Sequence, residues 1–133
     1  MGFEVIRIKP GEDLAEVLPL RQEIFESGED ELDEIGISIV LKDQGESVAC
    51  GRVVLDLEDD RIIIEQIGVK KERRRQHIGT EVLEQLMQIA RECESVNVWA
   101  KTRMNPIAEE MMEKHGFEQM NSYWMVVETA EYK

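Results

Sequence analysis

Residues 62–80 read Ile62-Ile63-Ile64-Glu65-Gln66-Ile67-Gly68-Val69 and then Lys70-Lys71-Glu72-Arg73-Arg74-Arg75-Gln76-His77-Ile78-Gly79-Thr80. The first part is an apolar run with a single charged side chain, Glu65, and predicts a buried β-strand. From Ile78 to Ala90 apolar residues recur at helical spacing, which predicts an amphipathic helix over roughly residues 77–94. The stretch therefore predicts a strand, a basic loop and a helix in direct succession.

The loop between strand and helix is a candidate anion site. Five of the six residues from Lys70 to Arg75 are basic, although the chain has a formal net charge of −13. Unpaired backbone N–H groups and the positive end of a helix dipole attract anions at a helix N-terminus. A phosphate group is therefore expected at the backbone amides of residues 74–79, with the Thr80 hydroxyl as a further donor. The alternative is a solvated basic turn.

Length and composition limit the class of protein. The 133 residues suit one domain, predicted to span residues 1–133, and 42% hydrophobic with 34% charged residues suits a soluble globular protein. No apolar stretch approaches the roughly 20 residues of a membrane span, and Met1-Gly2-Phe3-Glu4 lacks a signal-peptide pattern, so a cytoplasmic protein is expected. The negative charge argues against general nucleic-acid or membrane binding. Cys50 and Cys93 lack metal-ligand neighbours, so both are predicted to be reduced packing residues, and no metal site is expected.

The rest of the chain alternates between strand and helix patterns. Asn105-Pro106 is a helix start signal and Gly116 a helix stop, while Pro19 should kink or restart an early helix near Leu18. Five methionines are predicted to fill the core: Met104, Met111, Met112, Met120 and Met125. The predicted strands span residues 3–8, 37–41, 47–55, 61–69, 96–100, 117–120 and 122–128, and the predicted helices 14–25, 77–94 and 105–115, with a short acidic helix or loop at 26–34. This order predicts an α/β domain with a mixed sheet.

In these residues the chain resembles the GNAT superfamily of acyl-CoA N-acyltransferases. Residues 64–86 are similar to the family's coenzyme A strand, pyrophosphate loop and following helix. The family's loop has Arg or Gln, two residues, Gly, one residue, then Gly or Ala; Arg74, His77 and Gly79 hold these places. Residues 105–117 resemble its later helix with a Gly-Phe ending, and residues 20–25 a first-helix pattern. The resemblance implies a mixed, largely antiparallel central sheet flanked by about four helices.

The resemblance also implies acetyl-CoA as co-substrate and a set of residues that bind it. The backbone of Ile67 and Val69 would pair with the pantetheine arm, and an amide of Gly68 or Val69 would stabilise the oxyanion. Asn105 would contact the cofactor or act only as a helix N-cap. The implied cofactor-binding set is Ile67, Gly68, Val69, Arg74, Arg75, Gln76, His77, Ile78, Gly79, Thr80, Asn105 and Met112.

Two positions depart from the family pattern. His77 replaces a glycine of the pyrophosphate loop, where it could add a contact to phosphate or crowd the ligand. Met112 holds the place of a tyrosine that protonates the departing thiolate. Since a thiol has a pKa of about 8.5, a thiolate leaves readily enough near neutral pH without that acid.

An alkyl amine has a pKa of about 10.4, so a base is the more valuable catalytic group. Glu65 is the candidate, because the family sometimes places a glutamate there; the alternative is a side chain that points to solvent. The acidic residues Glu29, Asp30 and Glu31 lie where the family covers its substrate, so they are predicted to attract a cationic amine or else to form a solvated face.

The favoured function is acetyl transfer from acetyl-CoA to a primary amine, on a small molecule or a protein, by direct nucleophilic attack. The alternative is a non-catalytic acyl-CoA-binding sensor or regulatory module of the same fold. The acceptor amine is open. A homodimer is possible through residues 122–128 if that strand lies at a sheet edge.

Overall fold

The computed structural model describes residues 2–56, 58–59, 61–102 and 105–133. The described strands form one seven-stranded sheet in the order β1-β2-β3-β4-β5-β7-β6. They are β1 (Glu4–Ile8), β2 (Gly36–Asp43), β3 (Glu46–Asp56), β4 (Arg61–Val69), β5 (Asn97–Lys101), β6 (Glu118–Gln119) and β7 (Trp124–Glu128). β4 and β5 are parallel, whereas the other neighbouring pairs are antiparallel. The predicted mixed, largely antiparallel sheet is confirmed.

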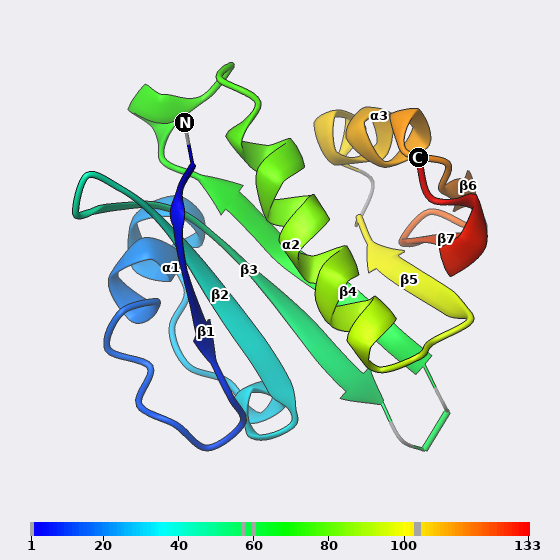
Figure 1. Cartoon of the computed structure of the whole chain (residues 1–133), viewed down its shortest axis with the longest axis horizontal. Coiled ribbons are helices and arrows are strands. Elements are labelled where there is room, and N and C mark those ends of the chain that lie inside the picture. The colour runs from blue at the N-terminus through cyan, green and yellow to red at the C-terminus, as the bar shows by residue number, and fades with distance from the viewer. Residues whose placement is uncertain (1, 57, 60, 103–104) are drawn as a thin grey trace.

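The helices lie on both faces of this sheet. They are α1 (Leu18–Phe25), α2 (Ile78–Glu92) and α3 (Pro106–Lys114), with short 3-10 helices at Glu31–Glu34, Lys71–Arg73 and Thr129–Glu131. α1 covers one face, and α2 and α3 cover the other (Figure 1). About four helices were expected; the described residues contain three α-helices, because the acidic segment forms only a single 3-10 turn. No described helix has both the length and the apolar character needed to cross a membrane.

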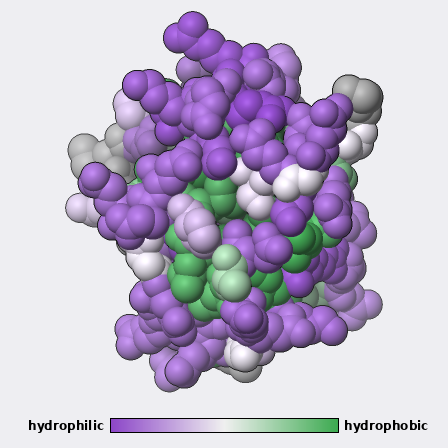
Figure 2. All heavy atoms as spheres, turned by 90° about the vertical axis from the view of Figure 1, so that its left-hand side faces the viewer, coloured by the Kyte–Doolittle hydropathy of each residue, from purple (hydrophilic) through white to green (hydrophobic). Residues whose placement is uncertain are grey.

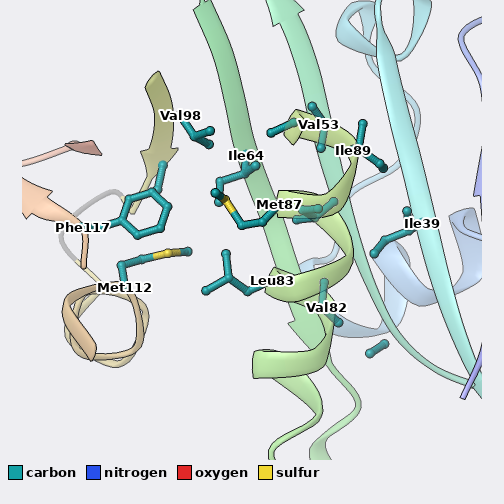
Figure 3. Close-up of a cluster of buried hydrophobic side chains, with 14 of the residues drawn as sticks. Ile39, Val53, Ile64, Val82, Leu83, Met87, Ile89, Val98, Met112 and Phe117 are labelled. Carbon is teal, nitrogen blue, oxygen red and sulfur yellow. The ribbon is translucent and has the colours of Figure 1, made fainter. Parts of the chain in front are cut away.

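The larger core lies between the sheet and the α2–α3 layer. Met87 of α2 lies beside Ile64 of β4, while Met112 and Phe117 reach the same cluster from the C-terminal part of the chain (Figure 3). The buried face of α2 confirms the predicted apolar stripe; it consists of Ile78, Val82, Leu83, Leu86, Met87, Ile89 and Ala90. This packing fixes the N-terminus of α2 at the end of β4.

A smaller core lies under α1, which approaches β4 closely. A Cβ atom on Gly68 would lie 2.5 Å from Cζ of Phe25 and 2.8 Å from Cγ2 of Ile24. Gly68 is therefore needed to seat α1 against the strand, whatever it does for a ligand. Viewed from the β1 side, charged and polar side chains cover most of the surface and apolar atoms show in its centre (Figure 2).

Three details differ from the sequence predictions. β7 lies between β5 and β6, so the strand proposed for pairing with another subunit is not an edge strand. Cys93 is exposed at the end of α2 and does not pack, whereas Cys50 is buried and burial raises the pKa of its thiol to about 12. Met112 and Met125 are buried as predicted, Met120 is exposed, and Met104 lies outside the described residues.

Candidate active site

β4 and β5 pair along only part of their length. Residues 62–64 of β4 pair with residues 98–100 of β5, and the described part of β4 beyond them has no pairing with β5. The separation begins at a β-bulge: Glu65 lies opposite Arg52 and Gly68 opposite Cys50, so two residues of β4 face Gly51 alone. Gln66 in the bulge has a φ of 53°. The bulge turns the end of β4 away from β5 and opens a gap in the sheet.

A cleft of about 1150 Å³ occupies this gap. One wall is the second half of β4 with the end of α1, and the opposite wall is α3 with the end of β5. Its far end is the loop before α2 and the first turn of that helix. Along β4, successive backbone amides point alternately toward β3 and toward the cleft. Lys70 N donates to the carbonyl of Val48 over 2.9 Å, so the amide of Val69 faces the gap.

The loop before α2 carries a run of unpaired backbone amides. Within the described chain, the amides of residues 75–80 have no hydrogen-bond partner, whereas Glu81 N donates to His77 O over 3.3 Å. Arg75 and His77 both adopt the left-handed conformation, with φ of 67° and 60°, which changes the direction of the backbone twice. The loop therefore presents consecutive unpaired donors at a helix N-terminus, an arrangement that suits a phosphate group.

His77 does not close this end of the cleft. Its side chain is exposed, and it forms the N-cap of α2 without a side-chain capping bond. Gly79 keeps space open between the two walls: a Cβ atom there would lie 3.6 Å from Sδ of Met111 and 3.9 Å from Cγ2 of Val69. The loop, the glycine and the cleft together fit a diphosphate joined to an extended arm.

The basic residues of the loop divide into two kinds. Arg73 pairs with Asp43 and Glu46 of the β2–β3 hairpin, so it anchors the loop. Arg74 donates from Nε to the carbonyl of Val69 over 3.1 Å. Arg75 is exposed and forms no ion pair with the described residues. Its charge therefore remains available to a phosphate.

Glu65 lies on β4 directly before the bulge and lines the cleft. It is only 7% exposed, so it does not point into open solvent. Arg52 of β3 donates from Nε to its Oε1 over 3.0 Å and from Nη2 to the same oxygen. Nζ of Lys101, at the end of β5, lies 4.0 Å from Oε2. The candidate base is thus held between two cations.

Arg52 joins Glu65 to a buried network of charges under α1. Its Nη1 donates to Asp33 Oδ1 over 3.1 Å and to Asp30 Oδ1 over 2.7 Å. Arg21 of α1 donates to both carboxylate oxygens of Asp33 over 2.8 Å. Burial would raise the pKa of Asp33, but the hydrogen bonds from Arg21, from the Asp30 amide and from Arg52 outweigh it and lower the pKa to about 2. Burial likewise opposes the charged form of Arg52, yet Asp30 and Glu65 raise its pKa above the usual value.

The structure does not bring the predicted substrate residues to the cleft. Glu29 and Glu31 are exposed, and Asp30 accepts from Arg52 and from the amide of Leu32. None of the three lines the cleft. The exposure of Glu29 and Glu31 agrees with the alternative of a solvated acidic face, whereas Asp30 and Asp33 neutralise buried arginines.

Of the predicted cofactor residues, Gln76 does not line the cleft, whereas all the others do. Asn105 caps α3, accepting from the amides of Ile107 and Ala108 over 3.0 and 3.2 Å, so its N-cap role is present. Met112 is 4% exposed and belongs to the core, but it also forms part of the cleft wall. The residues that line the cleft include Ile67, Gly68, Val69, Arg74, Arg75, His77, Ile78, Gly79, Thr80, Asn105 and Met112.

Neither tyrosine lines the cleft. Tyr132 donates its hydroxyl to Glu84 over 3.0 Å, and burial together with this carboxylate raises its pKa above the usual value. Tyr123 is exposed and precedes β7, rather than lying on the strand as predicted. A tyrosine acid is therefore not supplied from another position.

Sequence reasoning missed Arg52 and Lys101. Arg52 interrupts an apolar strand with a charge, as Glu65 does, whereas Lys101 is the last residue of β5. Two opposite charges inside neighbouring strands are a signal that they pair, because an unpaired buried charge is costly. The described residues contain no cluster of His, Cys, Asp and Glu suited to a metal ion.

The chain matches the Acetyltransferase (GNAT) family over residues 7–117. The comparison with curated proteins returns no match. Among solved structures, the ribosomal-protein-S18-alanine N-acetyltransferase from Escherichia coli superposes with a TM-score of 0.76 at 17% identity, covering 96% of this chain and 94% of that one. A GNAT family acetyltransferase from Elizabethkingia anophelis with acetyl-CoA bound gives 0.75 at 16%, covering 96% and 98%. A putative acyl-CoA N-acyltransferase from Klebsiella pneumoniae gives 0.71 at 20%, covering 96% and 97%. These likenesses show the shared fold.

Proposed function

We propose that this chain, which belongs to the acetyltransferase (GNAT) family, moves an acetyl group from acetyl-CoA to a primary amine by direct nucleophilic attack. Family membership makes the chain an acyltransferase; the acetyl group, the amine and the roles of single residues are the proposal. The proposal also includes that residues 1–133 form a single domain and that the protein is cytoplasmic. The observation that carries it is the run of unpaired amides from residue 75 to residue 80 at the end of the cleft.

The residues of the cleft have two tasks toward acetyl-CoA in this proposal. The loop amides and the start of α2 hold the pyrophosphate, assisted by Arg75 and the Thr80 hydroxyl. Val69 faces the gap with its amide, which suits it to stabilise the oxyanion that develops on the thioester carbonyl. Bound acetyl-CoA supplies the thioester, and its thiol is a tolerable leaving group without a tyrosine.

Glu65 takes the proton of the attacking amine. Its Oε1 is occupied by Arg52, so Oε2 is the oxygen that accepts, directly or through a water. Arg52 fixes the carboxylate at the bulge, where β4 leaves β5 and the amine can reach the thioester. A positioned base of this kind contributes about 10²- to 10⁴-fold to the rate.

The experiment combines binding and turnover. Wild type and Glu65→Gln are titrated calorimetrically with acetyl-CoA, and thiol release is followed with a panel of amines. Glu65→Gln should bind acetyl-CoA like wild type and lose about 10²- to 10⁴-fold in kcat. Glu118→Gln, an exposed glutamate on β6, is the matched control and should retain full turnover.

Each outcome separates one alternative. Unchanged turnover in Glu65→Gln would remove the assigned base. Tight acetyl-CoA binding with no turnover of any amine would support the alternative, a non-catalytic acyl-CoA-binding sensor. Absence of binding would reject both the enzyme and the sensor.

A further inference from the structure

The charges that line the cleft indicate which kind of acceptor amine can bind there. Among the described charged side chains that line it, five are cationic and two are anionic: Arg73, Arg74, Arg75, Lys101 and Lys114 against Glu65 and Glu110. Glu110 pairs with Lys114 over 3.5 Å. The carboxylates of Asp30 and Asp33 are bound to buried arginines outside the cleft wall. The three arginines lie at the loop end, where Arg73 is paired with Asp43 and Glu46 and the other two belong to the proposed phosphate site, so Lys101 and Glu65 are the charges left for an acceptor.

Lys101 is the cation beside Glu65, in the part of the cleft where the proposed mechanism places the amine. It lies across the gap from Glu65, with Nζ 4.0 Å from Oε2, and its side chain is 27% exposed. The Trp124 ring, whose centroid lies 5.8 Å from Nζ, restricts the positions that this ammonium can take. The mechanism above uses the arginines at the loop and at Glu65 but gives Lys101 no task.

We infer that the acceptor is a small primary amine with a nearby carboxylate, such as an α-amino acid, and that Lys101 binds this carboxylate. The inference rests on the proposed acetyl transfer. The 4.0 Å between Lys101 Nζ and Glu65 Oε2 suits a molecule whose amine and carboxylate share one carbon atom, so that each group meets its opposite charge.

Binding of such an acceptor also frees the base. The substrate carboxylate replaces Glu65 Oε2 as the partner of Lys101, and Oε2 then accepts the proton that converts the bound ammonium to the free amine. The nitrogen–carbon bond forms, the carbon–sulfur bond of the thioester breaks, and the second proton lost by the nitrogen passes to the departing sulfur, so that coenzyme A leaves as the thiol. An acceptor without the carboxylate leaves Lys101 beside Oε2, so it is a poorer substrate in both KM and kcat.

The test compares α-amino acids with their carboxamides, and with a linear diamine, in a thiol-release assay. Wild type should favour each amino acid over its amide by about tenfold or more in kcat/KM, as expected for a bond to a charged group. Lys101→Met, which keeps the length and removes the charge, should abolish most of this preference by raising KM for the amino acid. Lys101→Arg should keep most of it. Lys9→Met, at an exposed lysine outside the cleft, is the matched control.

Two results would overturn the inference while acetyl transfer stands. One is wild type that uses the amide or the diamine as well as the amino acid; the other is a Lys101→Met variant that keeps the preference. Acetyl-CoA binding without turnover of any amine would instead reject the proposed function. The wild-type ratio decides the question even if a variant at Lys101 folds poorly.

Discussion

Arg52 and Glu65 lie directly opposite each other on β3 and β4, one residue before the bulge that opens the cleft. The guanidinium of Arg52 is 1% exposed and also binds Asp30 and Asp33. One arginine therefore links the candidate base to the segment after α1. Buried ion pairs of this kind are costly to break from one side, because the remaining partner stays desolvated.

Arg52→Met should destabilise the fold by about 3–5 kcal/mol, because it leaves the carboxylates of Glu65 and Asp33 with fewer partners. Urea unfolding at neutral pH measures this loss. The exposed pair of Arg7 and Glu92, joined over 2.8 Å, supplies the control: Arg7→Met should cost far less, since water screens that pair. Equal losses of unfolding free energy in both variants would mean that the buried network stabilises the fold no more than the exposed pair does.

Gly79→Ala should separate ligand binding from folding. The structure has room for the new methyl group, and alanine is favoured over glycine within a helix, so thermal stability should hold or rise slightly. Affinity for acetyl-CoA should fall about tenfold, because the methyl group occupies the space that the pyrophosphate approaches. A Cβ atom on Gly28 would meet nothing within 4 Å, and Gly28 lies outside the cleft, so Gly28→Ala should leave the affinity unchanged. Calorimetric titration gives the affinity of both variants for acetyl-CoA, and thermal unfolding gives their stability.

Asp33 should produce a distinct acid transition in stability. Its pKa is lowered from 3.8 to about 2 in the folded protein, so its contribution is fully present above about pH 4 and is lost as the pH falls towards 2. The loss amounts to about 2 kcal/mol. Unfolding free energies measured between about pH 5 and about pH 2 should show this slope in wild type and a flatter curve in Asp33→Asn. Glu31→Gln, an exposed neighbour, should follow wild type.

Arg75 and Arg73 should behave differently when each is replaced by alanine. Arg75→Ala should weaken acetyl-CoA binding by roughly two- to fivefold and reduce its dependence on salt, without changing thermal unfolding. Arg73→Ala should lower the unfolding temperature, because it releases the loop from Asp43 and Glu46. If Arg75→Ala binds acetyl-CoA like wild type at low salt, this side chain is not a phosphate contact.

The elements around the cleft were predictable because their signals are local. The apolar run before Lys70, the helical stripe of α2 and the Asn105-Pro106 start of α3 each depend on neighbouring residues, and each prediction agrees with the structure within a few residues. The loop donors followed from the strand, loop and helix order for the same reason.

The features that were missed depend on residues far apart in the chain. Arg21, Asp33, Arg52 and Glu65 come from four different elements, and only the folded sheet brings them together. The acidic segment read as solvated because nothing local distinguishes Asp33, which is 6% exposed, from its exposed neighbours. The bulge at Gln66 likewise leaves no local mark, since a residue other than glycine holds the left-handed conformation there.

The shared arginine also bears on how such a protein diverges in evolution. A substitution at one of the four residues of the network leaves an unpaired buried charge at another. The four positions should therefore covary among homologues and change as a set; they are Arg21, Asp33, Arg52 and Glu65. The exposed part of the phosphate loop has no such coupling and can drift one residue at a time. Ancestral reconstructions of this lineage should therefore find the replacement of the proposed base, Glu65, accompanied by loss of the opposing guanidinium of Arg52.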